Sequence, residues 1–457
     1  MPGRRQFLKL FAAATASGIA GGSWLSQTAS SRVIEWKNWS GSQSCVPRAR
    51  LAPATLQELQ QLVASSNGPI RPVGAGHSFT PLVPTEGDIV SLARLSGLIE
   101  HDRASLQATF HAGTRLSAIG APLHEVGQAL INMPDIDEQT LAGAIATGTH
   151  GTGAGIGGLP SFVTGLELVT ATGELISCNQ EHNREVFEAA RLSLGALGII
   201  SKIRLQNTNP YRSRRESWIL DWDETLAQAD HLADTRRNFE FYYIPFSARC
   251  FLHSHDLTEE DKHATPVHDP NESLHDLKLV RDYLSWSDTL RGLPIKAIAA
   301  TMDKEVVVEA SWLNYASERN VRFNEMEYHL PRENGLDALR EVRQVLERDH
   351  KAVFFPIEVR FVKADDVWLS PFYHRDSLSI AVHRFHQEDY RPFFKAIEPV
   401  FRKYGGRPHW GKLNTVSAGE FAEMYPRWQK FLAVRQQLDP AGKFLNPYLA
   451  SLFGAAI

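Results

Sequence analysis

The chain has 457 residues, of which 43% are hydrophobic and 22% charged, and these globular proportions exclude a disordered, fibrous or coiled-coil protein. Its 48 Lys and Arg against 52 Asp and Glu give a formal net charge of −4, which argues against a nucleic-acid partner. The 3 cysteines lie far apart without a CxxC pair, so a zinc ribbon is excluded and a disulfide scaffold is not expected.

Residues 1–31 have the order of an export signal. Paired arginines at positions 4 and 5 precede Phe7-Leu8-Lys9, an apolar stretch follows over 10–19, and small polar residues fill 21–31. The paired arginines followed by x-Phe-Leu-Lys resemble the bacterial twin-arginine signal, although an ordinary amphipathic helix is the alternative. The apolar stretch is short for a span of about 20 residues. We therefore expect export to the periplasm, with a membrane attachment only if the segment is retained.

The next part of the chain, residues 36–210, predicts short strands mixed with helices. A helix is expected from Thr55, because Thr55 and Glu58 form a capping box and leucines follow at helical spacing. Strands are expected at 70–73, 89–92, 106–113, 162–170, 174–178 and 199–205, and helices at 116–130 and 187–192. Asn207 to Pro210 marks a boundary, so this part predicts an α+β domain.

A second α+β domain is expected over 211–457. Strands are predicted at 239–245, 324–331, 353–361 and 378–385, and helices at 336–348, 390–404 and from 427 onward, before a tail that ends near 447. The charged, His-rich stretch 253–276 is predicted to be an excursion from the domain or an exposed loop.

Two glycine-rich runs are candidate ligand loops. Gly74-Ala75-Gly76-His77-Ser78 follows a strand and can turn backbone N–H groups toward a phosphate, but Pro81 and Pro84 exclude the helix that a dinucleotide fingerprint needs. A second run extends over 147–158. A plain turn can explain either run, but two runs, each with a histidine, favour close approach of a ligand to the backbone.

Charged residues on apolar strands form the second group of candidates. Glu358 and Arg360 share one face of a strand, because side chains alternate with a period of two, and a structural ion pair is the alternative. His383 lies in a similar strand, where a core histidine is the simpler explanation. His409-Trp410-Gly411-Lys412 combines an aromatic ring with a cation, as a surface turn also can. None of these candidates has metal-ligand spacing.

Together, in chain order, these motifs resemble the FAD-linked sugar-lactone and alditol oxidases of the vanillyl-alcohol oxidase superfamily. The resemblance rests on Gly-x-Gly-His-Ser at 74–78, the run at 146–153, Asn-Glu-Met-Glu-Tyr at 324–328, Glu358-x-Arg360, and His-Trp-Gly-Lys at 409–412. It implies a two-subdomain FAD-binding domain over 36–210 and an α+β cap domain with an antiparallel sheet over 211–457. It also implies an FAD joined covalently to His77.

The resemblance assigns further roles residue by residue. Glu358 and Arg360 would bind and polarise the reacting hydroxyl, His383 would lie in the same pocket, and Lys412 would stabilise the anionic reduced flavin after hydride transfer to N5. The implied cofactor-binding residues are Gly74, Ala75, Gly76, His77, Ser78, Asp135, Gly143, Thr147, Gly148, His150, Gly151, Gly153, Ile200 and Lys412.

The chain departs from the alditol oxidases at three positions. Pro134-Asp135 replaces Gly-Ser, and proline there is associated with oxygen access, which favours oxygen as acceptor and hydrogen peroxide as product. Phe385 replaces a polar residue, which favours a sugar lactone, such as D-arabinono-1,4-lactone or L-gulono-1,4-lactone, over an open polyol. The alternatives are an alditol oxidase, a dehydrogenase that reduces a quinone or cytochrome, and a carbohydrate-binding protein without enzymatic activity. The 10 tryptophans would favour the last, because aromatic rings bind sugars.

Overall fold

The computed structural model describes residues 35–265, 269–299 and 304–455. The predicted export segment, residues 1–31, lies outside the described residues. Within the described ranges, no helix combines the length and hydropathy that a bilayer span requires.

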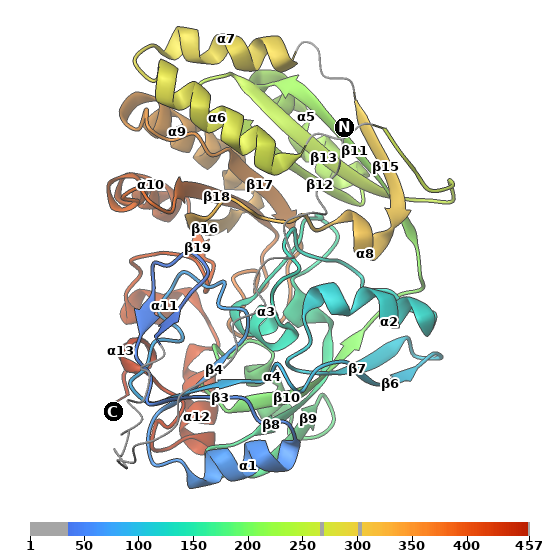
Figure 1. Ribbon diagram of the computed structural model, residues 1–457, viewed down its shortest axis with the longest axis vertical. Coiled ribbons are helices and arrows are strands. Elements are labelled where there is room, and N and C mark those ends of the chain that lie inside the picture. The colour runs from blue at the N-terminus through green and yellow to red at the C-terminus, as the bar shows by residue number, and fades with distance from the viewer. Residues whose placement is uncertain (1–34, 266–268, 300–303, 456–457) are drawn as a thin grey trace, which may run out of the picture. The chain divides into compact units, whose positions relative to one another are not determined.

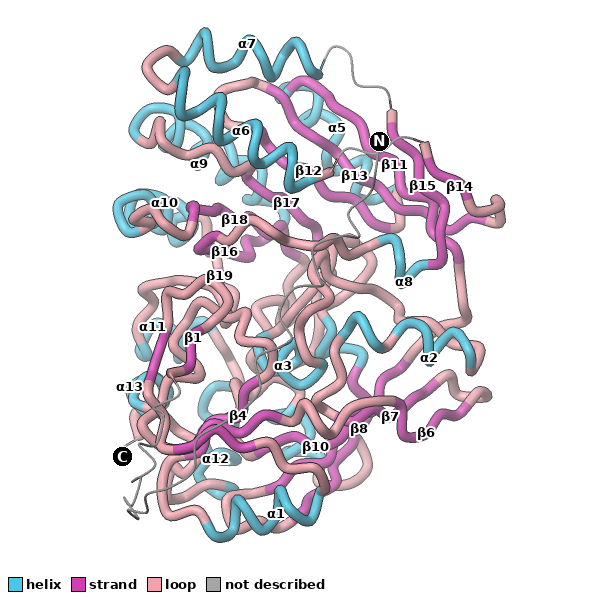
Figure 2. The backbone as a smooth tube through the Cα atoms, in the orientation of Figure 1, coloured by secondary structure: helices cyan, strands magenta, loops and turns pink. Residues whose placement is uncertain are grey.

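The described strands before residue 210 form a three-stranded sheet, a five-stranded sheet and a two-stranded pair (Figure 2). A parallel sheet has the order β3 (Ala49–Leu51), β5 (Asp88–Ser91), β4 (Ile70–Val73). An antiparallel sheet has the order β6 (Leu98–Asp102), β7 (Gln107–His111), β10 (Ile199–Gln206), β8 (Val163–Val169), β9 (Leu175–Asn179). A short pair, β1 (Trp36–Lys37) and β2 (Ser44–Cys45), precedes them. The helices of this part are α1 (Leu56–Ser65), α2 (Gly120–Glu125), α3 (Leu141–Thr147) and α4 (Arg184–Ala190), with single 3₁₀ turns at Leu116–Ala118 and Leu159–Phe162.

A larger sheet of nine antiparallel strands follows (Figure 1). Its order is β14 (His263–Ala264), β15 (Glu305–Ala310), β11 (Arg212–Asp221), β13 (Arg249–Thr258), β12 (Asn238–Ile244), β17 (Ile357–Val362), β18 (Ser377–Phe385), β16 (Phe323–Pro331), β19 (Arg407–Pro408). The helices between these strands are α5 (Trp222–Thr235), α6 (Pro270–Leu284), α7 (Asp288–Ala299), α8 (Ser311–Asn314), α9 (Arg332–Asp349) and α10 (Arg391–Lys403). The predicted α+β composition with an antiparallel sheet is confirmed.

The two faces of the nine-stranded sheet differ in chemistry. Alternate residues of the four adjacent strands β12, β17, β18 and β16 pack with the apolar faces of α5, α9 and α10 in one hydrophobic cluster, as Phe241, Val359 and Ile380 do. Because side chains alternate along a strand, the residues between them point to the opposite face. Those residues are largely ionisable, so this fold concentrates charged side chains on one side of the sheet.

The end of the chain returns to the first part of the molecule. Helices α11 (Ala418–Met424), α12 (Trp428–Leu438) and α13 (Pro447–Phe453) share a hydrophobic cluster with the strands and helices before residue 210. In that cluster Trp410 stacks on Phe421 at a centroid distance of 4.5 Å. The domain division at 210/211 stays a prediction, and the hydrophobic clusters group the chain from Trp410 onward with the first part.

Four sequence predictions about single elements need correction. The stretch 253–276 contains an exposed loop at 259–262, but it begins inside β13, where His255 is buried, and it ends in α6. Histidine, serine and aspartate are weak indicators of a strand. The segment therefore forms a strand because it pairs with β11 and β12, not because of its own residue preferences. The helix expected over 116–130 ends at Glu125, before Gly127 at φ +76°. The strand expected at 353–361 begins only at Ile357, and α13 replaces the tail, with the Asn446 side chain capping it.

Candidate active site

The ionisable face of the nine-stranded sheet lines a cavity of about 470 Å³. A second cavity of about 120 Å³ lies beside the first glycine-rich run. The two share four lining residues, His77, Ser78, Gln139 and Thr147. We call them the main cavity and the glycine-lined cavity.

Most of the predicted site residues meet in these two cavities. The main cavity is lined by His77, Ser78, Asp135, Thr147, His150, Glu358, Arg360, His383 and Lys412. The glycine-lined cavity is lined by Gly74, Ala75, Gly76, His77, Ser78, Gly143, Thr147 and Ile200. Residues more than 300 positions apart in the chain are thus brought together, and His77 stands where the two cavities join.

Three predicted cofactor-binding glycines line neither cavity. Gly148 ends α3 in the left-handed conformation at φ +79°. A Cβ atom on Gly151 would lie 2.3 Å from the Met133 carbonyl oxygen. The Gly153 backbone N–H donates to the Phe361 carbonyl oxygen at 2.6 Å. These glycines therefore fit the loop closely against its neighbours.

The walls of the glycine-lined cavity suit an extended phosphate-bearing group. A Cβ atom on Gly74 would lie 2.2 Å from Thr140 Oγ1, and Gly76 has a φ of +73°, so a larger residue at either position would strain or displace the loop. Gly143, Gly195 and Gly198 also contribute to the lining. Backbone exposed in this way offers N–H groups and close approach, which a pyrophosphate needs. The residues present therefore fit FAD, whose pyrophosphate they would hold.

Arg360 is the centre of the charge network in the main cavity. Its Nη2 lies 2.6 Å from Glu327 Oε1, its Nε lies 3.5 Å from Glu358 Oε1, and its Nη1 lies 3.6 Å from Asp135 Oδ1. Burial opposes the charge on the guanidinium, but Glu327, Glu358 and Asp135 together hold the pKa of Arg360 well above its usual value. The chain thus places a permanent cation beside three carboxylates.

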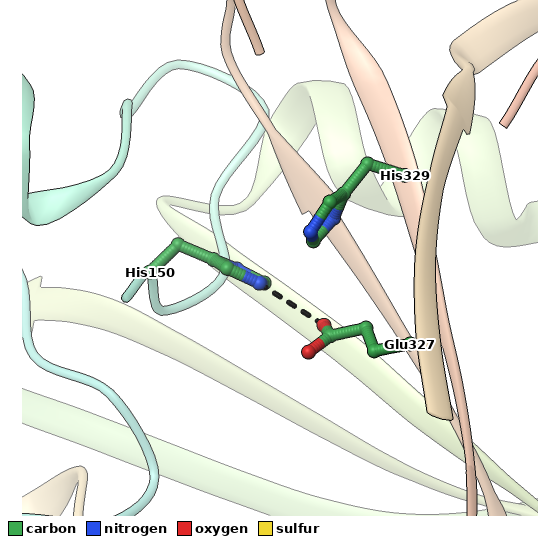
Figure 3. Close-up of side chains that lie close together, drawn as sticks. All are labelled: His150, Glu327 and His329. Carbon is green, nitrogen blue, oxygen red and sulfur yellow. Dashed lines mark hydrogen bonds and ion pairs between the residues drawn. The ribbon is translucent and has the colours of Figure 1, made fainter. Parts of the chain in front are cut away.

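Glu327 also contacts a pair of histidines (Figure 3). His150 Nε2 lies 3.0 Å from Glu327 Oε1, and His150 Nδ1 lies 2.8 Å from the Gly151 carbonyl oxygen. His329 Nδ1 lies 2.7 Å from Ser379 Oγ. The ligand atoms of His150, Glu327 and His329 fall within 4.8 Å of one another, as a metal site would require. Because Arg360 already neutralises the charge of Glu327, the geometry favours a hydrogen-bonded cluster over a metal site.

Lys412 is a second cation in the lining of the main cavity. Its ammonium group forms a short ion pair with Glu325, and Nζ lies 5.3 Å from the centroid of the Phe79 ring. Burial lowers the pKa of Lys412, but Glu325 and Glu327 outweigh this effect and raise it. His383 Nε2 lies 3.7 Å from Glu325 Oε1, and burial lowers the pKa of His383 to about 4. At neutral pH, the cavity therefore holds a charged lysine beside a neutral histidine.

His77 is held by an aromatic neighbour. Its ring stacks on Trp39 with a centroid distance of 5.2 Å. Burial, followed by the charge of Lys412, lowers the pKa of His77 to about 4. The imidazole is therefore neutral at neutral pH, and one ring nitrogen carries a free lone pair.

Several residues that line the main cavity are not among the site residues predicted from the sequence. Glu325 and Glu327 belong to the Asn-Glu-Met-Glu-Tyr motif, and Glu240 and Tyr242 alternate with buried aromatic residues on β12. The period-two alternation that predicts Glu358 and Arg360 on one strand face also applies to these four residues. Arg319 had no such signal; it pairs with Asp135 at 2.9 Å. Burial raises the pKa of Asp135, but Arg319, Arg360 and Lys412 outweigh this effect and bring it to about 2.

Both parts of the chain match known protein families. Residues 203–452 match the family model described as D-arabinono-1,4-lactone oxidase, and residues 47–179 match the FAD binding domain. The L-gulono-1,4-lactone dehydrogenase of Mycobacterium tuberculosis is 35% identical over 92% of this chain and 99% of its own length. The L-gulonolactone oxidase of Bos taurus is 30% identical over 92% of this chain and 98% of its own.

The fold also has a solved counterpart. A solvent-stable cholesterol oxidase superposes with a TM-score of 0.76 over 92% of this chain and 97% of its own, at 18% identity. This likeness confirms the predicted vanillyl-alcohol oxidase type of fold. FAD is the cofactor that the matched domain binds, and the chain is an FAD-dependent oxidoreductase. The chain belongs to the D-arabinono-1,4-lactone oxidase family.

Proposed function

We propose that this protein oxidises a carbinol of a sugar lactone, such as L-gulono-1,4-lactone or D-arabinono-1,4-lactone, with FAD joined covalently to His77 and oxygen as electron acceptor. One observation carries the proposal: Glu358, Arg360, His383 and Lys412 line a single cavity, the main cavity, which shares His77 with the glycine-lined cavity. The family membership supports the substrate class.

The side chains divide the work of alcohol oxidation. When bound, FAD supplies the two-electron acceptor for the carbinol hydride. Arg360 can donate to the substrate hydroxyl oxygen, and Glu358, 3.5 Å from Arg360, can accept the hydroxyl proton. Lys412 supplies positive charge on the same cavity wall, where it would stabilise negative charge that develops during reduction. The neutral His383 can accept or donate one hydrogen bond to a second hydroxyl of the substrate.

The substrate class is tested by a panel of lactones and polyols. Flavin-loaded protein is mixed anaerobically with each compound, and bleaching of flavin absorbance is followed. We expect reduction by 1,4-lactones and little by open-chain polyols. Faster reduction by polyols would assign the protein to the alditol oxidases, and a colourless protein after expression with ample riboflavin would favour a binding protein.

The covalent linkage at His77 is tested on denatured protein. The neutral imidazole and its place at the junction of the two cavities support the linkage. In His77→Ala, we expect acid-denatured protein to lose its bound flavin fluorescence, whereas the exposed control His101→Ala should keep it. Fluorescence that stays with the His77→Ala chain would reject this linkage.

Oxygen as acceptor rests on Pro134, which lines the main cavity. A relative at 35% identity is named a dehydrogenase, so transfer to a quinone or cytochrome is the specific alternative. Stopped-flow mixing of the reduced enzyme with oxygen separates the two. We expect rapid reoxidation with stoichiometric peroxide; slow reoxidation together with fast dye reduction would favour the dehydrogenase.

We further propose that residues 1–31 direct export through the twin-arginine route. Replacement of both Arg4 and Arg5 by lysine should retain the protein in the cytoplasmic fraction, while the unchanged chain is recovered from the periplasm. Equal distribution of the two proteins would reject the proposal, and recovery of the unchanged chain with membranes would indicate a retained anchor.

A further inference from the structure

The hydroxyl of Tyr242 stands between two carboxyl groups in the main cavity. It lies 3.1 Å from Glu358 Oε1 and 3.2 Å from Glu240 Oε1. The strand register places these groups, because Tyr242 on β12 is opposite Glu358 on β17 and Glu240 is opposite Arg360. All three residues line the cavity.

The number of protons available determines whether both contacts can be hydrogen bonds. A phenol carries one proton, and an ionised carboxylate can only accept hydrogen bonds. If both carboxyl groups were ionised, one of the two contacts would join two oxygens with no proton between them. Both contacts become hydrogen bonds when one carboxyl group is protonated and donates to the Tyr242 oxygen.

The surroundings indicate which acid carries the proton. Burial raises the pKa of Glu358, but the charge of Arg360, whose Nε lies 3.5 Å from Glu358 Oε1, opposes this effect and favours the ionised form. Among the residues that the structure describes, no ion pair within 4.0 Å involves Glu240. Burial, followed by the charge of Glu358, raises the pKa of Glu240 to about 8. The charged and titratable groups around it on all sides are Glu358, Arg360, Asp135, Tyr242, His253, Arg215 and Arg319.

We propose that Glu240 is a positioning residue: it is a neutral carboxylic acid at neutral pH that donates to the Tyr242 oxygen and so directs the Tyr242 hydroxyl onto Glu358. The Glu358 carboxylate then has a fixed donor on one oxygen and its remaining lone pairs turned to the cavity. The benefit for the reaction rests on the proposed function, in which Glu358 accepts the substrate proton; the protonation of Glu240 does not.

Infrared spectroscopy tests the protonation without any turnover. The holoenzyme at neutral pH should show a carbonyl band of a protonated carboxylic acid that shifts in D₂O, disappears as the pH rises through about 8, and is absent from Glu240→Gln. Glu398→Gln is the matched control, since buried Glu398 also accepts from a tyrosine hydroxyl, that of Tyr328 at 2.5 Å, and from the Thr415 N–H at 2.6 Å, but does not line the main cavity. A wild-type spectrum equal to that of Glu240→Gln at neutral pH would overturn the proposal.

The pH profile of flavin reduction by a lactone tests the positioning role. Above its pKa, Glu240 would be ionised and would compete with Glu358 for the single hydroxyl proton, so the wild-type rate should fall by about threefold across the transition. Glu240→Gln should keep the neutral-pH rate within about twofold and lack this fall, because its amide N–H still donates to Tyr242. Tyr242→Phe should also lack the fall while keeping the infrared band. Persistence of the fall in either variant would refute the role, whereas absence of lactone turnover with the band intact would refute only the proposed function.

Discussion

Replacement of Glu327 measures how much the buried charge network stabilises the protein. Glu327 is 1% exposed, and its Oε1 accepts from Arg360 at 2.6 Å. In Glu327→Ala, the guanidinium keeps only contacts of 3.5 and 3.6 Å to Glu358 and Asp135. Removal of one partner from a buried pair costs about 3–5 kcal/mol. Glu327→Gln keeps a neutral acceptor, so we expect a smaller loss of about 2 kcal/mol.

The control for this experiment is an exposed pair of the same length. Glu341 on α9 lies 2.6 Å from Lys403 Nζ on α10, at the surface. Glu341→Ala should cost less than about 1 kcal/mol. Urea unfolding followed by tryptophan fluorescence, at low and high salt, gives both values, and salt should reduce only the exposed contribution. Equal losses for the two alanine variants, or a Glu327 contribution that salt removes, would refute the assignment of Glu327 to a buried network.

Three further outcomes are expected from the cavity geometry. Lys412→Met should lower the rate of flavin reduction by about 100-fold with a much smaller effect on substrate affinity, measured by stopped flow; equal losses in both would assign Lys412 to binding. Gly74→Ala should lower FAD loading, measured by the ratio of flavin to protein absorbance, because its Cβ would lie 2.2 Å from Thr140 Oγ1, while Gly155→Ala, with nothing within 4 Å, should load normally. The folded-state pKa of Asp135, about 2, lies below its unfolded value of about 3.9, so its contribution is present above about pH 4 and is lost as the pH falls toward 2. Unfolding measured over this range should show a shallower dependence in Asp135→Asn.

The alternating pattern of the strands predicts part of the ionisable face of the nine-stranded sheet. In β17, charged residues alternate with Ile357, Val359 and Phe361, so Glu358 and Arg360 could be placed on one face from the sequence alone. In β16, Glu325 and Glu327 alternate with Met326 and Tyr328 in the same way, but nothing in the local sequence indicates that this face borders a cavity. That information lies in the pairing of β16 with β18, which a single sequence does not contain.

The glycine-rich runs illustrate a second limit of local patterns. Gly74 and Gly143 line a cavity, whereas Gly151 and Gly153 serve close packing of the loop against Met133 and β17. A glycine is required for a positive φ, for close backbone approach or for a groove, and its own sequence context does not distinguish these needs. The run could therefore be predicted as a loop near the ligand, but not residue by residue.

The placement of ionisable groups on one sheet face explains why the cavity tolerates so many of them. Asp135, Glu327 and Glu358 surround the single guanidinium of Arg360, and Glu325 has Lys412. A buried carboxylate is stable only when a cation or donors replace its lost water, and Glu240, for which the described residues give no ion pair within 4.0 Å, is the acid whose pKa rises to about 8. The charge balance that stabilises the folded chain thus separates two of the cavity acids by role: in the proposed reaction Glu358, which lies beside Arg360, accepts a proton, whereas Glu240 holds a proton already.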